Sequence, residues 1–146
     1  GVDRWCALIG AHRQSPGPML VVMAGTATTI DGLDGDGNFL GGFILPGLGL
    51  MRRSLAAGTA GLPLADGSHD PWPRCTGDAI AAGAIEAQAG AIERAFARLP
   101  GTGKRCLLSG GHAVAISEHL VIAHALAQNL PMEGLLALAG EPLGEE

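Results

Sequence analysis

Two short glycine-containing segments are the first residues in this sequence whose types could do chemistry. Gly25-Thr26 follows an apolar run and precedes residues rich in β-branched side chains. Because glycine has no Cβ to obstruct an anion, backbone N–H groups and the threonine hydroxyl can approach a phosphate at such a turn. A simple glycine turn between two strands is the alternative interpretation, and the Gly-Thr pair alone does not decide between them.

The second segment is Ser109-Gly110-Gly111, which follows the apolar residues 106–108 and precedes a predicted helix. N–H groups at the start of a helix favour anions, so a nucleotide could bind at this turn. Taken alone, the segment is also a common connection between a strand and a helix. Both interpretations stay open at this point.

The elements that would position these turns begin with three consecutive strands. Residues 20–22 and 26–31 predict a hairpin that turns at Gly25, and residues 39–45 predict a third strand that stops at Pro46. A short helix is expected over residues 48–57, before Gly58.

A loop over residues 61–74 and a long helix follow. The helix is expected to begin at Thr76 as N-cap and to end near Leu99. One face carries an apolar stripe, formed by Ile80, Ala84, Ile85, Ile92, Phe96 and Leu99. The other face carries small residues, namely Gly83, Ala87, Gly90 and Ala91.

The remaining chain alternates strand and helix. We expect a strand over 106–108, a helix through Leu120, a strand near 121–125 and a helix over 131–139. The resulting order, β-β-β-α-β-α-β-α, resembles a ribonuclease-H-like domain, the repeated unit of the actin, sugar-kinase and Hsp70 superfamily. The predicted fold class is therefore α/β with a mixed sheet.

Composition excludes several classes of protein. The chain has 146 residues and is 47% hydrophobic, which is enough apolar material for one folded domain, and apolar runs are too short to span a membrane. A net charge of -5 argues against direct binding of nucleic acid. The three cysteines form no CxxC pair, which indicates neither a disulfide framework nor a zinc site and favours a reducing cytoplasm.

Three other patterns do not support binding sites. Residues 34–38 (DGDGN) resemble the start of a calcium loop, but Phe39 and Leu45 occupy the positions of the required Gly and Glu, so we expect a turn. Residues 101–104 (GTGK) lack the spacing of a P-loop. The histidines lack zinc-binding spacing and are expected to be solvated or buried in the core; they are His112, His119 and His124.

Five motifs together carry a family resemblance. They are residues 1–5 (GVDRW), 23–31 (MAGTATTID), 41–48 (GGFILPGL), 76–80 (TGDAI) and 108–111 (LSGG). In this order they resemble the type III pantothenate kinases, which carry GxDR, DxGTAxTxD, GGxIxPG and TxxAIxxG. The resemblance covers about the C-terminal three fifths of that family; its N-terminal Asp-x-Gly-Asn-Thr phosphate motif is not in this sequence. We therefore predict that residues 1–18 are the tail of an N-terminal domain with a linker, and that residues 19–146 are the C-terminal ribonuclease-H-like domain.

The resemblance implies ATP-dependent phosphorylation of pantothenate to 4'-phosphopantothenate, the first step toward coenzyme A, with Mg²⁺ bridging the phosphates. Asp3 would accept the proton of the pantothenate hydroxyl, and Arg4 would hold an anion or fix that carboxylate. The residues implied to hold pantothenate are Gly1, Val2, Asp3, Arg4 and Thr76; those implied to bind ATP are Gly25 and Thr26 at the phosphates and Gly110 and Gly111 at adenosine. A homodimer through the helix over residues 76–98 is also expected.

One residue departs from the family pattern. The phosphate motif of the family opens with an Asp that ligates a monovalent cation, K⁺ or NH₄⁺, and this sequence has Met23 there. A thioether is a soft donor that suits a hard cation poorly, so the metal site and much of the activity are in doubt. The alternatives are a non-catalytic homologue that acts as an accessory or regulatory factor, since relatives have been described as accessory transcription factors, and a dimerising scaffold. We also predict that these 146 residues alone are inactive.

Overall fold

A five-stranded mixed sheet forms the centre of the computed structural model, which describes residues 1–62, 64 and 66–140. The strand order is β3-β2-β1-β4-β5. β1, β2 and β3 pair antiparallel, whereas β4 is parallel to β1 and β5 is parallel to β4. The strands are β1 (Met19–Ala24), β2 (Ala27–Leu33), β3 (Phe39–Pro46), β4 (Arg105–Ser109) and β5 (Ala125–Leu126). The predicted hairpin at Gly25 and the predicted mixed α/β sheet are confirmed.

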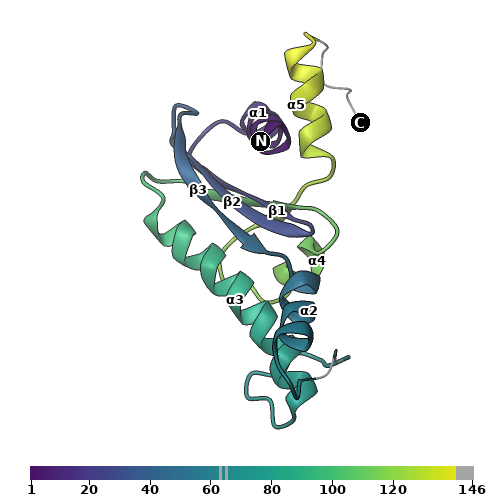
Figure 1. The fold of residues 1–146 in the computed structure, drawn as a ribbon. Helices are drawn as coiled ribbons and strands as arrows, with labels where there is room; N and C mark the ends of the chain where they lie inside the picture. Colours follow the sequence, from purple (N-terminus) through teal and green to yellow (C-terminus); the bar gives the residue numbers. More distant parts are fainter. Residues whose placement is uncertain (63, 65, 141–146) are drawn as a thin grey trace.

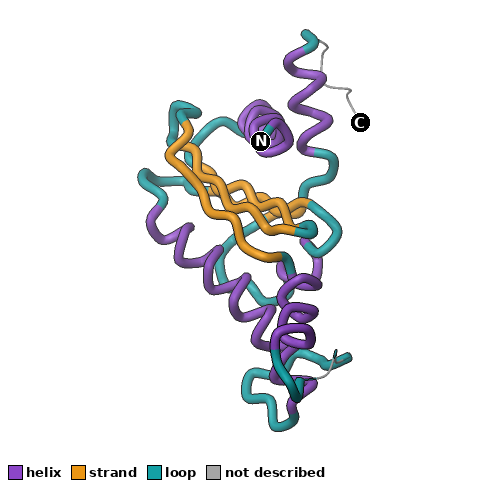
Figure 2. The backbone as a smooth tube through the Cα atoms, viewed as in Figure 1, coloured by secondary structure: helices purple, strands orange, loops and turns teal. Residues whose placement is uncertain are grey.

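Helices cover the sheet in two layers (Figures 1 and 2). α1 and α5 lie side by side on one face, and α2, α3 and α4 lie on the other. The helices are α1 (Val2–Gln14), α2 (Leu48–Gly58), α3 (Thr76–Arg98), α4 (Ala113–Ser117) and α5 (Leu130–Leu138).

The central strand β1 contributes to a hydrophobic core on each face of the sheet. Leu20 and Val22 belong to the cluster under α3, whereas Met19 and Val21 belong to the cluster under α1 and α5. This division follows from the alternation of side chains along a strand. Because apolar residues occupy both sets of positions, β1 is buried on both sides, as is typical of a strand between two helical layers.

α1 and α5 approach each other very closely. A Cβ added to Gly134 would overlap the backbone of Cys6, and one added to Gly10 would lie 2.5 Å from the Leu130 carbonyl oxygen. Residues 1–18 were predicted to be the tail of an N-terminal domain with a linker, without a helix. The structure corrects this for residues 2–14, whose buried side chains pack under the sheet. The domain boundary at residue 18 stays a prediction.

The predicted turn at residues 34–38 joins β2 to β3. The Asp34 carboxylate accepts the backbone N–H groups of Asp36, at 3.0 Å, and Asn38, at 2.8 Å. The hydrogen bond from the Asn38 side chain is the largest cause that lowers the pKa of Asp34, and the backbone N–H of Asn38 is the next. The side chain therefore stabilises a tight turn, as expected of an aspartate that begins a polar turn sequence.

Several boundaries differ from the prediction. Cys75 is the N-cap of α3, and Thr76 is its first helical residue, so Thr76 does not cap the helix. α4 ends at Ser117 instead of Leu120, and the last strand shrinks to β5. The Val121 N–H donates to the Glu93 carboxylate at 2.8 Å, so this residue of the predicted strand is held by α3. The predicted loop over 61–74 has neither helix nor strand among its described residues; positions 63 and 65 lie outside them.

Candidate functional site

The Gly25-Thr26 turn is held against the start of α2. The Gly47 N–H donates to the Thr26 carbonyl oxygen at 2.9 Å, and the Gly25 N–H donates to that of Ala27 at 3.1 Å. A Cβ on Gly47 would overlap the Gly25 carbonyl oxygen, so glycine is required there for this close approach. The end of β3 thus fixes the shape of the turn and leaves Thr26 exposed.

The Gly110-Gly111 turn lies next to the first one. β1 and β4 are parallel neighbours, with Met23 opposite Ser109, so their carboxyl ends meet at the same edge of the sheet. Gly110 has a φ of 104°, and a Cβ on it would lie 2.5 Å from the Ala24 carbonyl oxygen. The His112 N–H donates to that same oxygen at 3.0 Å. The structure therefore brings the two turns together around the backbone of Ala24.

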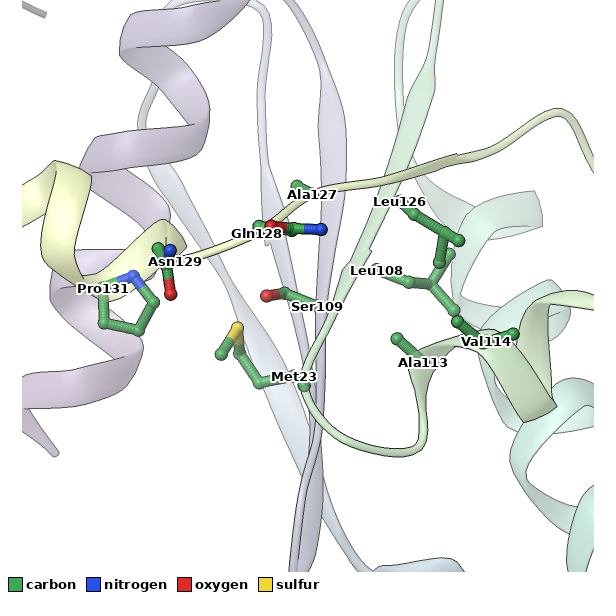
Figure 3. Close-up of a pocket in the computed structure, with 11 residues that line it drawn as sticks. Met23, Leu108, Ser109, Ala113, Val114, Leu126, Ala127, Gln128, Asn129 and Pro131 are labelled. Carbon is green, nitrogen blue, oxygen red and sulfur yellow. The ribbon is translucent and has the colours of Figure 1, made fainter. Parts of the chain in front are cut away.

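A cavity of about 470 Å³ opens beside the two turns, on the side of α5 (Figure 3). The Met23 thioether, the Ser109 hydroxyl and the Asn129 side chain lie around it. Asn129 is the N-cap of α5, has a left-handed backbone with φ 54°, and makes no side-chain capping bond. All eleven lining residues are uncharged: Met23, Leu108, Ser109, Gly110, Ala113, Val114, Leu126, Ala127, Gln128, Asn129 and Pro131. Within the described part of the chain, no group of three or more His, Cys, Asp or Glu side chains could hold a metal ion.

The start of α1 is anchored to β2 by an ion pair. The Arg4 Nε donates to Asp31 Oδ2 at 3.0 Å, and Nη2 of the same guanidinium donates to Oδ1. The Asp31 side chain is only 2% exposed, and its hydrogen bond with Arg4 raises the pKa of the guanidinium. A Cβ on Gly42 would overlap Asp31 Oδ1, so the glycine makes room for the pair.

This ion pair corrects one expectation for Arg4. The carboxylate that Arg4 fixes is Asp31, and Asp3 lies exposed on the same first turn of α1. A structural role of Asp31 was not predicted. A carboxylate inside an otherwise apolar and β-branched strand was the available signal, because a buried charge needs a partner.

Thr76 lies in a different region. With Ser54, Leu55 and Gly83 it lines a mostly apolar cavity of about 500 Å³ between α2 and α3. Figure 1 shows the start of α1 and the start of α3 on opposite sides of the sheet. The chain therefore brings Gly25, Thr26, Gly110 and Gly111 together, but it does not bring Thr76 to the segment formed by residues 1–4. The predicted roles of all these residues stay predictions.

The loop before α3 is held down by Asp78. The Ser68 N–H donates to the Asp78 carboxylate at 2.9 Å, and this hydrogen bond is the largest cause that lowers the pKa of Asp78. A second contact joins the loop to α3, where His69 Nε2 and the Glu86 carboxylate lie 2.7 Å apart. The His69 ring also lies against His119, with 3.9 Å between their centroids.

Those contacts close one side of a third cavity, which holds about 320 Å³ between α2, α3 and α4. Arg52, His69, His112 and His119 line it together with Glu118. Because His112 directly follows Gly111, the cavity adjoins the Gly110-Gly111 turn. His112 and His119, which were predicted to be solvated or core histidines, both line this cavity. Their spacing gave no signal of this, since the cavity forms from separate helices.

Comparison with known proteins decides the family. The family model described as type III pantothenate kinase matches residues 1–98. The chain belongs to the type III pantothenate kinase family. It is 65% identical over 139 residues to a type III pantothenate kinase of Dechloromonas aromatica, covering 95% of this chain and 58% of that protein. It is 54% identical over 140 residues to one of an Azoarcus species, covering 95% and 53%. This chain of the type III pantothenate kinase family thus spans little more than half the length of these relatives.

A solved structure agrees on the fold. A solved structure from Campylobacter jejuni, assigned by its name to the Baf family of transcriptional activators, superposes with a TM-score of 0.73 at 26% identity, over 96% of this chain and 63% of that one. The predicted ribonuclease-H-like fold and the predicted family are both confirmed. Of the helices in the described part of the chain, none is long and apolar enough to cross a membrane.

Proposed function

We propose that the full-length protein phosphorylates pantothenate to 4'-phosphopantothenate with ATP. The observation that carries this proposal is the meeting of the Gly25-Thr26 and Gly110-Gly111 turns at Ala24. Two exposed backbone turns at the carboxyl ends of neighbouring parallel strands are a suitable cradle for a nucleotide. The proposal covers the whole protein, of which these residues are one part, and it assigns the reaction to the cytoplasm.

In this proposal, the first turn binds the ATP phosphates through the backbone of Gly25 and the hydroxyl of Thr26. Gly110 and Gly111 line the adenosine, and the cavity with Arg52 and His112 is beside them. Mg²⁺ prefers oxygen ligands and is bound in many kinases mainly through the phosphates of the nucleotide, so it would arrive with ATP. Phosphoryl transfer depends mostly on positioning and charge neutralisation, which is what rigid turns of this kind can supply.

Pantothenate would be held by the first residues of α1, where Asp3 accepts the proton of its hydroxyl group. Gly1, Val2 and Arg4 complete this contact. The ion pair with Asp31 supports such a role, because it fixes the first turn of α1 and uses only two of the five N–H donors of Arg4. Exposure of Asp3 leaves its carboxylate accessible to a substrate.

We further propose a homodimer through α3. α1, which carries Asp3, and the start of α3, which carries Thr76, lie on opposite sides of the sheet, so a pantothenate site that uses both residues needs a second copy of the chain. Gly83, Ala87 and Gly90 are exposed on α3 and would allow close approach of a partner helix. Ala91 does not belong to this surface, because it is partly buried and packs against the core.

The test is an ADP-release assay with pantothenate on the full-length protein. Asp3→Asn should reduce turnover by about 100-fold or more, because general-base catalysis typically contributes that much. Asp66→Asn, which removes an exposed carboxylate far along the chain, is the matched control and should leave turnover unchanged. Turnover that survives Asp3→Asn contradicts the assignment. Nucleotide binding without any ADP release would favour the non-catalytic homologue.

A further inference from the structure

The position of Met23 bears on the monovalent cation that the family pattern implies. A carboxylate at this position would lie beside the phosphate turn, where its charge must be compensated by a cation. Here the side chain is a thioether, which packs against the apolar cluster under α1 and α5 and faces the 470 Å³ cavity. The polar side chains that line that cavity, those of Ser109, Gln128 and Asn129, offer only neutral oxygen and nitrogen atoms. These residues do not fit a carboxylate-bound cation.

The other carboxylate of the same motif is not available either. Asp31 lies two residues beyond Thr29 on β2, and the Arg4 guanidinium already neutralises it. Thr29 pairs with Met23 across the strands, and its buried hydroxyl has no hydrogen-bond partner among the described residues. One hydroxyl beside a thioether does not replace a carboxylate as ligand for a hard cation.

The charge balance nevertheless stays intact. An aspartate and its bound cation together contribute no net charge beside the phosphates, and methionine contributes none either. We propose that this protein binds nucleotide without a monovalent cation, because Met23 removes both the cation ligand and the negative charge that makes the cation necessary. The inference rests on the proposed nucleotide site, but not on pantothenate being the substrate.

The direct test uses Tl⁺, a spectroscopic substitute for K⁺, with the full-length protein. Thallium NMR should detect no Tl⁺ binding that K⁺ displaces in the natural protein or in Met23→Leu. Met23→Asp should bind Tl⁺, and K⁺ should displace it. Displaceable Tl⁺ on the natural protein overturns the inference, and this measurement stands even if Met23→Asp fails to fold. If a folded Met23→Asp variant does not bind Tl⁺, then Met23 is not the reason why the natural protein lacks a monovalent-cation site, and the inference is overturned.

A second readout is nucleotide affinity in potassium chloride against choline chloride at equal ionic strength. The natural protein should show the same affinity in both salts. Met23→Asp should bind ATP about tenfold or more tightly in potassium than in choline, as expected for two coupled sites. A response of that size in the natural protein contradicts the inference. Failure of the proposed function would appear separately, as absence of ADP release with pantothenate while the salt independence of ATP binding persists.

Discussion

Helical glycines occur on both faces of the sheet, and they behave in opposite ways. On one face, Gly10 of α1 and Gly134 of α5 lie where the two helices touch backbone to backbone. On the other face, Gly83 and Gly90 of α3 have nothing within 4 Å of an added Cβ. Glycine therefore permits the close packing of α1 against α5, whereas on α3 it lies at an exposed surface that no other described segment contacts.

The difference teaches how to interpret small residues in a helix. Glycine destabilises a helix interior relative to alanine by about 1 kcal/mol, so each such position needs a compensating contact. For Gly10 and Gly134 the compensation is the crossing of α1 and α5. For Gly83 and Gly90 the described chain offers none, and the proposed second copy would supply it.

The largest expected effect is at the α1–α5 crossing. Gly134→Ala places a methyl group on the backbone of Cys6, and rigid backbone atoms cannot yield as a flexible side chain can. We expect a loss of about 3 kcal/mol or more in the free energy of unfolding, at the upper end for overpacking. Urea denaturation of the full-length protein followed by circular dichroism measures it. A loss below about 1 kcal/mol would mean that the helices separate easily.

The second prediction concerns association of two chains through the exposed surface of α3. Gly83→Leu puts a large side chain at the proposed dimer contact, and we expect the dimer to dissociate about tenfold or more readily, equivalent to about 1.4 kcal/mol. Analytical ultracentrifugation at tens of micromolar measures the association. Asp36→Asn, in the exposed turn between β2 and β3, is the control. If the natural protein is monomeric at this concentration and Gly83→Leu sediments in the same way, the proposed dimer is contradicted.

The smallest predicted effect is a gain in the free energy of unfolding. Gly90→Ala adds a methyl group that meets no atom of its own chain within 4 Å, so at protein concentrations low enough to keep the chain monomeric only the helix propensity changes. We expect the free energy of unfolding to rise by about 0.5–1 kcal/mol. The same denaturation experiment compares this variant with Gly134→Ala, since both make the same chemical change. Equal destabilisation by both would erase the contrast between the two faces.

Much of the fold was predictable because it depends on local patterns. The hairpin at Gly25, the third strand and the long helix follow from alternation, turn residues and helical periodicity, and the structure has them close to the expected bounds. α1 was missed because its helical face is completed by α5, a segment about 120 residues away that no local pattern reveals. The predicted N-cap at Thr76 is wrong by one residue, because Cys75 takes that position without a side-chain capping hydrogen bond, and sequence preferences for a capping side chain cannot reveal such a start.

The candidate site divides in the same way. The two glycine turns were predictable, since each follows a buried strand and strand order brings their ends together. The pairing of Arg4 with Asp31 was not, because it links α1 to the middle of β2 across 27 positions of sequence. Spacing within one segment cannot show which carboxylate a neighbouring helix will meet.

The three thiols differ in a way that makes one of them useful. Cys6 and Cys106 are buried, and burial raises the pKa of the Cys106 thiol to about 12, so it stays protonated and unreactive under ordinary labelling conditions. Cys75 is exposed and immediately precedes α3. Among these three thiols, a maleimide probe would therefore attach at Cys75, at the start of the helix proposed to form the dimer contact. Two probes in a dimer would report the distance between the two copies without any engineered cysteine.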